Sequence, residues 1–176
     1  MSMELLISTI LLLGLLGVAV VGDLRRHRIP NALVLTGVAL GLAGQVYTGG
    51  LSGLGDSLLG MLICFALFLP MYAVGGMAAG DVKLMTMVGG FLPFHYALWA
   101  ALFSLIAGGV CGFLIVLARG QLLQTLQRYW LSVRAQAYLA PTVDEVAGKP
   151  FPYSIAILIG TLNSVYWQLV ADGWGV

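Results

Sequence analysis

Charged residues are scarce in this chain: they make up 9% of its 176 residues, whereas a soluble domain carries about 25%. Hydrophobic residues make up 60%, so water is not the main solvent of the folded protein. The net charge is only +1, which argues against nucleic acid as a partner. The composition excludes an ordinary soluble domain and predicts an all-α, polytopic membrane protein.

Cysteine is also rare, and no zinc-protease motif is present. Cys64 and Cys111 both sit inside apolar runs, so we expect two free thiols rather than a disulfide or a C-x-x-C metal site. The H-E-x-x-H pattern of zinc proteases does not occur in the sequence, which excludes that class of enzyme.

Five apolar runs approach the length of about 20 residues that crosses a bilayer. The first run lacks a preceding positive charge and ends in Asp23-Leu-Arg-Arg, so we interpret it as a retained helix rather than a signal peptide. A sixth, shorter run is interrupted by Gly89-Gly90 and Pro93 and would cross only as a short or tilted helix. The five long runs are Leu5–Gly22, Ala32–Thr48, Ser57–Val74, Tyr96–Ala118 and Tyr153–Ala171, and the short one is Val82–Phe94.

The positive charges predict how these spans are oriented. If Asp23–Pro30 is cytoplasmic, six alternating spans bring every basic residue to the cytoplasmic side, whereas five spans would misplace four of them. We therefore expect about six spans in the inner (cytoplasmic) membrane, with both termini outside. The basic residues are Arg25, Arg26, Arg28, Lys83, Arg119, Arg128, Arg134 and Lys149.

The one long polar stretch, residues 119–149, is predicted to form an amphipathic helix on the cytoplasmic face of the membrane. Its apolar residues recur at helical spacing, with arginines and glutamines off that stripe. The stripe consists of Leu122, Leu126, Tyr129, Trp130, Val133 and Ala137.

Two aspartates at membrane boundaries are the candidates for chemistry. Asp23 ends the first span and Asp81 begins the short one, and the expected topology brings both to the cytoplasmic boundary. Two neighbouring carboxylates share a proton, so one can activate water as a general base while the other acts as a general acid. The alternative is structural, because Asp81 could cap a helix and Asp23 could neutralise an arginine. Asp56, on the outer side, is predicted to be an N-cap.

Two linked motifs resemble the type IV prepilin peptidase family. One is Asp23-Leu-Arg-Arg-His-Arg-Ile-Pro-Asn31, and the other is Gly76-Met-Ala-Ala-Gly-Asp-Val-Lys-Leu84, which is similar to the Gly-x-Gly-Asp signature of these intramembrane aspartyl proteases. The resemblance covers about residues 8–115 and returns weakly at Pro150–Tyr153.

The resemblance implies one integral-membrane peptidase domain over residues 1–176, including a last span at 150–171. It implies that Asp23 and Asp81 are catalytic and that no metal or organic cofactor is needed. The substrate would be a prepilin or pseudopilin with a basic leader and a hydrophobic helix, cleaved at the cytoplasmic face during pilus biogenesis or protein secretion, with membrane lipid around it. Residues near the substrate or in support would be Ala78, Gly80, Lys83, Pro30 and Asn31.

The chain departs from the family pattern in two ways. Ala78 replaces the first glycine of the signature, which keeps an inactive relative open as an alternative. The larger members carry a cytoplasmic domain with paired cysteines and also methylate their product. Residues 23–30 leave no place for it, so the chain resembles the short form that processes Flp-type pilins.

The sequence also leaves two other functions open, a serine protease and a non-enzymatic membrane protein. Gly50-Leu-Ser-Gly53 has the form of a rhomboid serine-protease motif, with His95 expected on the same outer side. A small transporter or membrane scaffold is the non-enzymatic alternative, although the spans lack the paired charges that ion-coupled transport needs. For Lys83, extension to the lipid headgroups is an alternative to a role at the site.

Overall fold

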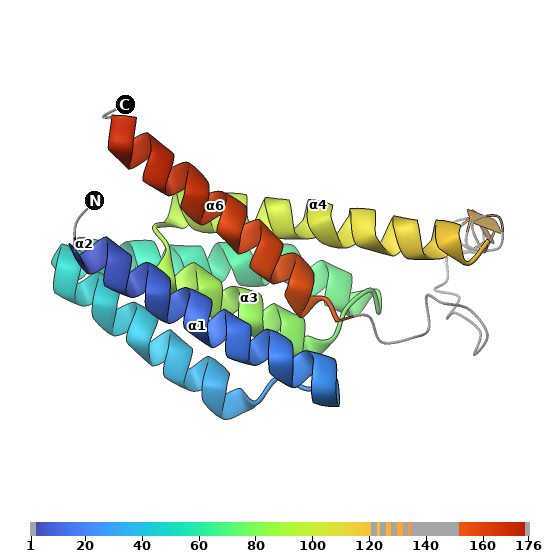
Figure 1. Cartoon of the computed structure of the whole chain (residues 1–176), viewed down its shortest axis with the longest axis horizontal. Helices are drawn as coiled ribbons and strands as arrows, with labels where there is room; N and C mark the ends of the chain where they lie inside the picture. Colours follow the sequence, from blue (N-terminus) through green and yellow to red (C-terminus); the bar gives the residue numbers. More distant parts are fainter. Residues whose placement is uncertain are drawn as a thin grey trace. The chain divides into compact units, whose positions relative to one another are not determined.

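The computed structural model describes residues 3–120, 123, 126, 127, 130, 131, 134 and 152–174. These residues are helical or lie in short connections, with no strand among them, which confirms the all-α class. Most of the predicted amphipathic helix at 119–149 lies outside the described residues. The helices are α1 (Met3–Arg26), α2 (Asn31–Ala73), α3 (Ala79–Phe91), α4 (Phe94–Ala118) and α6 (Ser154–Trp174), as labelled in Figure 1.

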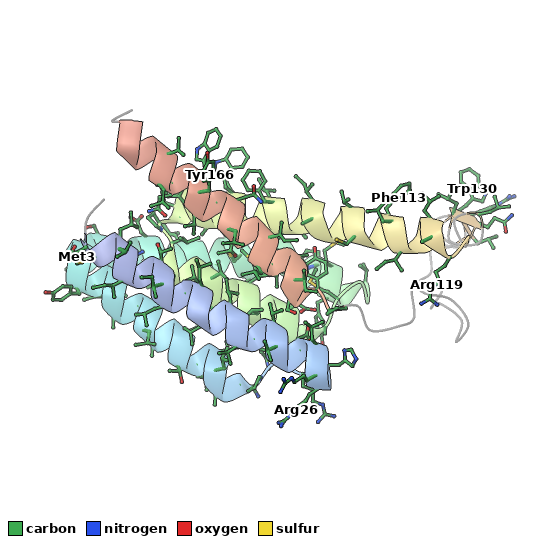
Figure 2. All side chains as sticks on the ribbon, viewed as in Figure 1. Met3, Arg26, Phe113, Arg119, Trp130 and Tyr166 are labelled. Carbon is green, nitrogen blue, oxygen red and sulfur yellow. The ribbon has the colours of Figure 1, made fainter. Side chains whose placement is uncertain are left out.

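Four of the helices in the described part are long and apolar enough to cross a membrane: α1, α2, α4 and residues Ser154–Ala171 of α6. Large apolar side chains are exposed along them, as Tyr166 of α6 is in Figure 2 with 69% of its surface accessible. A soluble monomer rarely exposes so much apolar surface, whereas lipid would cover it. The chain is therefore a membrane protein, and the number of six spans stays a prediction.

Helix α2 contains two of the predicted spans, joined at Gly50. This residue has φ 60° and ψ −136°, a conformation that glycine reaches far more cheaply than other residues. Both halves of α2 reach the same end of α3: Gln45 Nε2 donates to the carbonyl of Phe91, and Ser57 Oγ to that of Gly90, each at 2.7 Å. The chain therefore folds back at Gly50.

The fold-back corrects two expectations about residues 49–56. We predicted a loop there, with Asp56 as the N-cap of the next span, but the segment is helical apart from Gly50. Asp56 lies inside the second half of α2, so its prediction as an N-cap is wrong. The physical reason is that one glycine with a positive φ is enough to reverse the direction of the chain, so no separate loop is needed.

Helix α3 is the buried centre of this part of the chain, and Figure 1 shows it beside α1 and α2. Its apolar residues are buried around the whole helix, as is typical of a helix enclosed by others. Gly60 and Gly89 face each other so closely that a Cβ on either would collide with the backbone of the other. The buried apolar residues of α3 are Val82, Leu84, Met85, Met87, Val88 and Phe91.

The start of α6 is anchored by the residue before it. The ring of Tyr153 packs edge-on against Phe68 of α2, with centroids 6.0 Å apart, and its hydroxyl donates to the Ser104 carbonyl of α4 at 3.2 Å. Further along α6, Ser164 Oγ donates to the Tyr96 carbonyl at 2.7 Å. These contacts fix the position of α6 along the first half of α4.

By their contacts the residues divide into two compact units. One consists of Met1–Ala107 with Pro152–Val176, and the other of Gly108–Phe151. The second contains the end of α4, which is followed by a turn in which Gly120 has φ 65°. All residues of the candidate site belong to the first unit.

Candidate active site

Asp23 lies in the last turn of α1 and is buried, with 8% of its surface exposed. Its Oδ2 accepts a hydrogen bond of 2.6 Å from the hydroxyl of Ser154, the first residue of α6. The helix ends at His27, whose φ is 48° and whose N–H donates to the Asp23 carbonyl at 2.7 Å. The backbone of Asp23 is thus held by the last hydrogen bond of α1, and its side chain is held by the start of α6.

Asp81 is the third residue of α3 and is 4% exposed. Its Oδ2 accepts a hydrogen bond of 3.1 Å from the backbone N–H of Ala78, which occupies the N-cap position. This is the return half of a capping box, and the other half is missing because alanine has no hydroxyl. Asp81 therefore does cap α3, but from position N3 in the first turn and not from the N-cap position.

Both carboxylates line one cavity of about 210 Å³. Its walls come from the end of α1, from the connection to α2 and from the first turns of α2 and α3. Six of the seven residues singled out in the sequence lie there, while Pro30 is the N-cap of α2 beside it. The lining residues are Asp23, His27, Arg28, Ile29, Asn31, Ala78, Gly80, Asp81 and Lys83.

The two carboxylates affect each other electrostatically. Asp81 precedes the apolar run of α3 and lies outside the four helices that are long enough to cross. The pKa of its carboxyl is raised to about 7: burial is the largest cause, a backbone hydrogen bond from Ala78 lowers the pKa, and the nearby Asp23 raises it. At neutral pH the pair can therefore carry a proton on Asp81.

The backbone around Asp81 suits the residues that are present. Ala78 has φ −82° and ψ 154°, an extended conformation open to any residue, so its methyl group causes no backbone strain. A Cβ at Gly80 would lie 3.5 Å from Ile29 Cδ1, which is ordinary van der Waals contact. The site is compatible with alanine at the first position of the signature.

Lys83 and Asn31 link α3 to α2 at the edge of the cavity. The ammonium of Lys83 donates to Asn31 Oδ1 at 3.2 Å, and both side chains are exposed. The contact gives Lys83 a partner within the protein, in addition to the lipid headgroups considered for it.

The other candidate groups do not form a second site in the described part of the chain. Ser52 is helical and donates its hydroxyl to the Gly49 carbonyl at 2.7 Å, and no hydrogen bond joins it to His95. Cys64 and Cys111 are unpaired, as expected. No cluster of three or more potential metal ligands occurs among the described residues.

Ser154 is the residue that sequence reasoning missed. It is completely buried and makes a short side-chain hydrogen bond to Asp23, 131 positions earlier in the chain. Its signal was weak: one serine after Pro152-Tyr153, where the resemblance is faint. Serine is common in membrane helices, so the residue type alone does not single it out.

Known proteins are similar to this chain over most of its length. The model of the type IV leader peptidase family matches residues 10–117. The prepilin leader peptidase/N-methyltransferase of Myxococcus xanthus is 30% identical over 157 residues, covering 85% of this chain and 43% of that protein. The chain thus spans less than half the length of that relative. No solved structure matches it.

Proposed function

Since the chain belongs to the type IV leader peptidase family, we propose that it is an intramembrane aspartic endopeptidase with Asp23 and Asp81 as its catalytic pair. The observation that carries the proposal is that these two buried aspartates, 58 positions apart, line the same cavity. Burying carboxylates in so apolar a protein is costly, and a shared catalytic task is a reason to keep both.

The two environments suggest a division of roles. Asp81, with its raised pKa, is the protonated member and acts as the general acid that protonates the carbonyl oxygen of the scissile peptide. Asp23, as the general base of the pair, takes a proton from the attacking water. In both residues Oδ2 is hydrogen-bonded, to Ser154 and to Ala78, which leaves each Oδ1 for water or substrate.

The substrate class follows from the family and from the position of the site. A prepilin-like precursor would keep its basic leader in the cytoplasm and its hydrophobic helix in the bilayer. The pair lies where α1 ends in Arg25 and Arg26, and Figure 2 shows Arg26 extending from this end of the helix. Basic residues at the end of a span favour the cytoplasmic face, so cleavage at the junction of leader and helix fits this location.

We also propose that cleavage is not followed by methylation at this domain. The match to the Myxococcus xanthus prepilin leader peptidase/N-methyltransferase covers 85% of this chain but 43% of that protein, so more than half of the bifunctional relative has no counterpart in the matched part of this chain. This supports the short form and a Flp-type prepilin as the preferred substrate over a type IV prepilin.

Co-expression with a prepilin tests the function directly. The protein would be produced with a Flp-type prepilin, and separately with a type IV prepilin, in a bacterium without its own prepilin peptidase. Loss of the leader is seen as a shift in gel mobility and confirmed by the mass of the product. We expect cleavage by the wild type and a loss of about 100-fold or more in Asp23→Asn and Asp81→Asn.

Asp56→Asn is the matched control, because it removes a carboxylate from α2 away from the cavity and should cleave normally. Ser52→Ala should also be active, whereas its inactivity would favour a serine protease. Full activity in either cavity-aspartate variant would refute the aspartic mechanism. A correctly inserted wild type that cuts neither prepilin would identify an inactive relative.

A further inference from the structure

Ser154 and Asp23 form the shortest side-chain to side-chain hydrogen bond in the described part of the chain. The hydroxyl oxygen lies 2.6 Å from Oδ2, at the short end of the range for a hydrogen bond donated by a hydroxyl. Ser154 is fully buried and Asp23 nearly so, which makes this bond electrostatically stronger than the same bond in water.

The hydroxyl is held firmly because the start of α6 is held firmly. Tyr153 immediately precedes it and is fixed by its ring contact with Phe68 and its hydrogen bond to the Ser104 carbonyl. The serine therefore reaches Asp23 from a part of α6 that is anchored on two other helices. A rigid support of this kind is what keeps a reacting group in productive geometry.

Given the proposed catalytic role of Asp23, we propose that Ser154 is a positioning residue that fixes the orientation of this carboxylate. The donated hydrogen bond occupies Oδ2, so that Oδ1 is the oxygen presented to water, and a hydrogen bond donated to a carboxylate stabilises its charged form. Oδ2 of Asp81 instead accepts a hydrogen bond from the backbone N–H of Ala78. The two aspartates thus differ in what holds them, which matches the difference in their roles.

The proposal predicts a specific effect of pH. The titratable and charged groups that share the cavity with Asp23 are Asp81 and Lys83 from α3, and His27 and Arg28 from the connection after α1. Helices α2 and α6 contribute uncharged groups, Asn31 and Ser154. Removing the hydroxyl leaves every charge in place, so a shift in the acidic limb of the pH–rate profile would report on the lost hydrogen bond alone.

The experiment compares variants of the full chain in detergent, with a purified Flp-type prepilin as substrate. In Ser154→Ala we expect the acidic limb to move up by about one pH unit, with kcat falling about tenfold on that limb. KM should change by less than about twofold, since substrate binding is not affected. Ser154→Thr keeps the hydroxyl, so its acidic limb should lie where that of the wild type does. Ser154→Val has the shape of the threonine variant but no hydroxyl, so its acidic limb should be shifted.

Ser164→Ala is the matched control, because it removes another buried hydroxyl of α6 whose partner, the Tyr96 carbonyl, lies outside the cavity. An acidic limb unchanged in both Ser154→Ala and Ser154→Val would overturn the proposal, as would an equal shift in Ser164→Ala. If Ser154→Ala does not insert into the membrane, the comparison of Ser154→Thr with Ser154→Val decides the question. Activity in Asp23→Asn would instead refute the proposed function itself, so the two failures are distinguishable.

Discussion

The ammonium of Lys83 donates a hydrogen bond of 3.2 Å to Oδ1 of Asn31, joining two residues that are 52 positions apart in the sequence. One belongs to the motif that contains Asp81 and the other closes the motif that contains Asp23. Both residues line the cavity. The bond therefore connects the first turn of α3 to the first turn of α2 beside the two aspartates.

A double-mutant cycle tests whether this link supports the site. We expect Lys83→Met and Asn31→Ala each to lower kcat/KM about three- to tenfold, because each breaks one exposed hydrogen bond. The double variant should be no worse than either single variant, since there is only one bond to lose. If Lys83 acts by reaching the lipid headgroups, Asn31→Ala should instead be silent and Lys83→Arg fully active.

The raised pKa of Asp81 predicts how cleavage depends on pH. With a pKa of about 7, its carboxyl keeps its proton below pH 7 and loses it above. Because the proposed general acid needs this proton, activity should fall about tenfold per pH unit above neutrality. An initial-rate profile with a Flp-type prepilin measures this, and a rate that keeps rising beyond pH 8 would contradict the assignment of Asp81 as the acid.

Thermal unfolding in detergent checks the same group independently of catalysis. Folding raises the pKa of the Asp81 carboxyl from its ordinary value of 3.8 to about 7, so between these values the folded state holds a proton that the unfolded state has lost, and stability falls from about pH 4 to about pH 7 and then levels off. The wild type should therefore lose stability over that range. Asp81→Asn, which cannot ionise, should lack this part of the pH dependence.

The contact between Gly60 and Gly89 predicts a stability effect of one methyl group. A Cβ at Gly60 would meet the Gly89 carbonyl, so Gly60→Ala should lower the free energy of unfolding by about 1–3 kcal/mol. Gly55→Ala is the matched control on the same helix, since nothing lies within 4 Å of a Cβ there. It should be neutral or slightly stabilising, and equal losses in the two variants would argue against the close packing of α2 and α3.

Topology is testable with two introduced cysteines. Arg26 is exposed at the end of α1, and Leu51 is 87% exposed just after the fold-back of α2. An impermeant thiol reagent should reach Arg26→Cys only from the cytoplasm and Leu51→Cys only from outside, in a Cys64→Ala, Cys111→Ala background. Labelling of both from one side would refute a crossing by the first half of α2, and with it the six-span arrangement.

Sequence reasoning predicted the elements better than their ends. Apolar length identifies α1, α4 and α6 because the bilayer imposes it. It could not predict that α2 continues to Gly50 and resumes at once, since a turn of one residue leaves no polar loop in the sequence. Helix α3 extends through Gly89 and Gly90 because its neighbours, rather than its own propensity, hold those residues in place.

The candidate site was predictable where residues share a motif and not where they meet across the fold. Asp23 and Asp81 were singled out because each lies in a motif that resembles the family's, and because the expected topology brings both to one boundary. The bond from Ser154 to Asp23 depends on where α6 begins relative to α1, and Tyr153 anchors the start of α6 on α2 and α4. No local pattern encodes that register, so Ser154 could be found only in the folded chain.

Ala78→Gly should change cleavage little. The φ of −82° at this position is accessible to alanine, so glycine would relieve no strain. It would only loosen the backbone before Asp81, and we expect kcat/KM within about threefold of the wild type. A wild type that cuts no prepilin but becomes active as Ala78→Gly would show that the alanine marks an inactive relative.

Ala78→Leu tests whether the substrate passes this residue. Ala78 lines the cavity of about 210 Å³, and three more carbon atoms there would fill part of the space beside Asp81. We expect kcat/KM to fall about tenfold or more because the scissile peptide can no longer approach closely. Ala79→Leu is the matched control, since Ala79 is exposed and not part of the lining, and it should cleave normally. Full activity in Ala78→Leu would mean that the substrate reaches the aspartates from another side, past the connection of His27, Arg28 and Ile29.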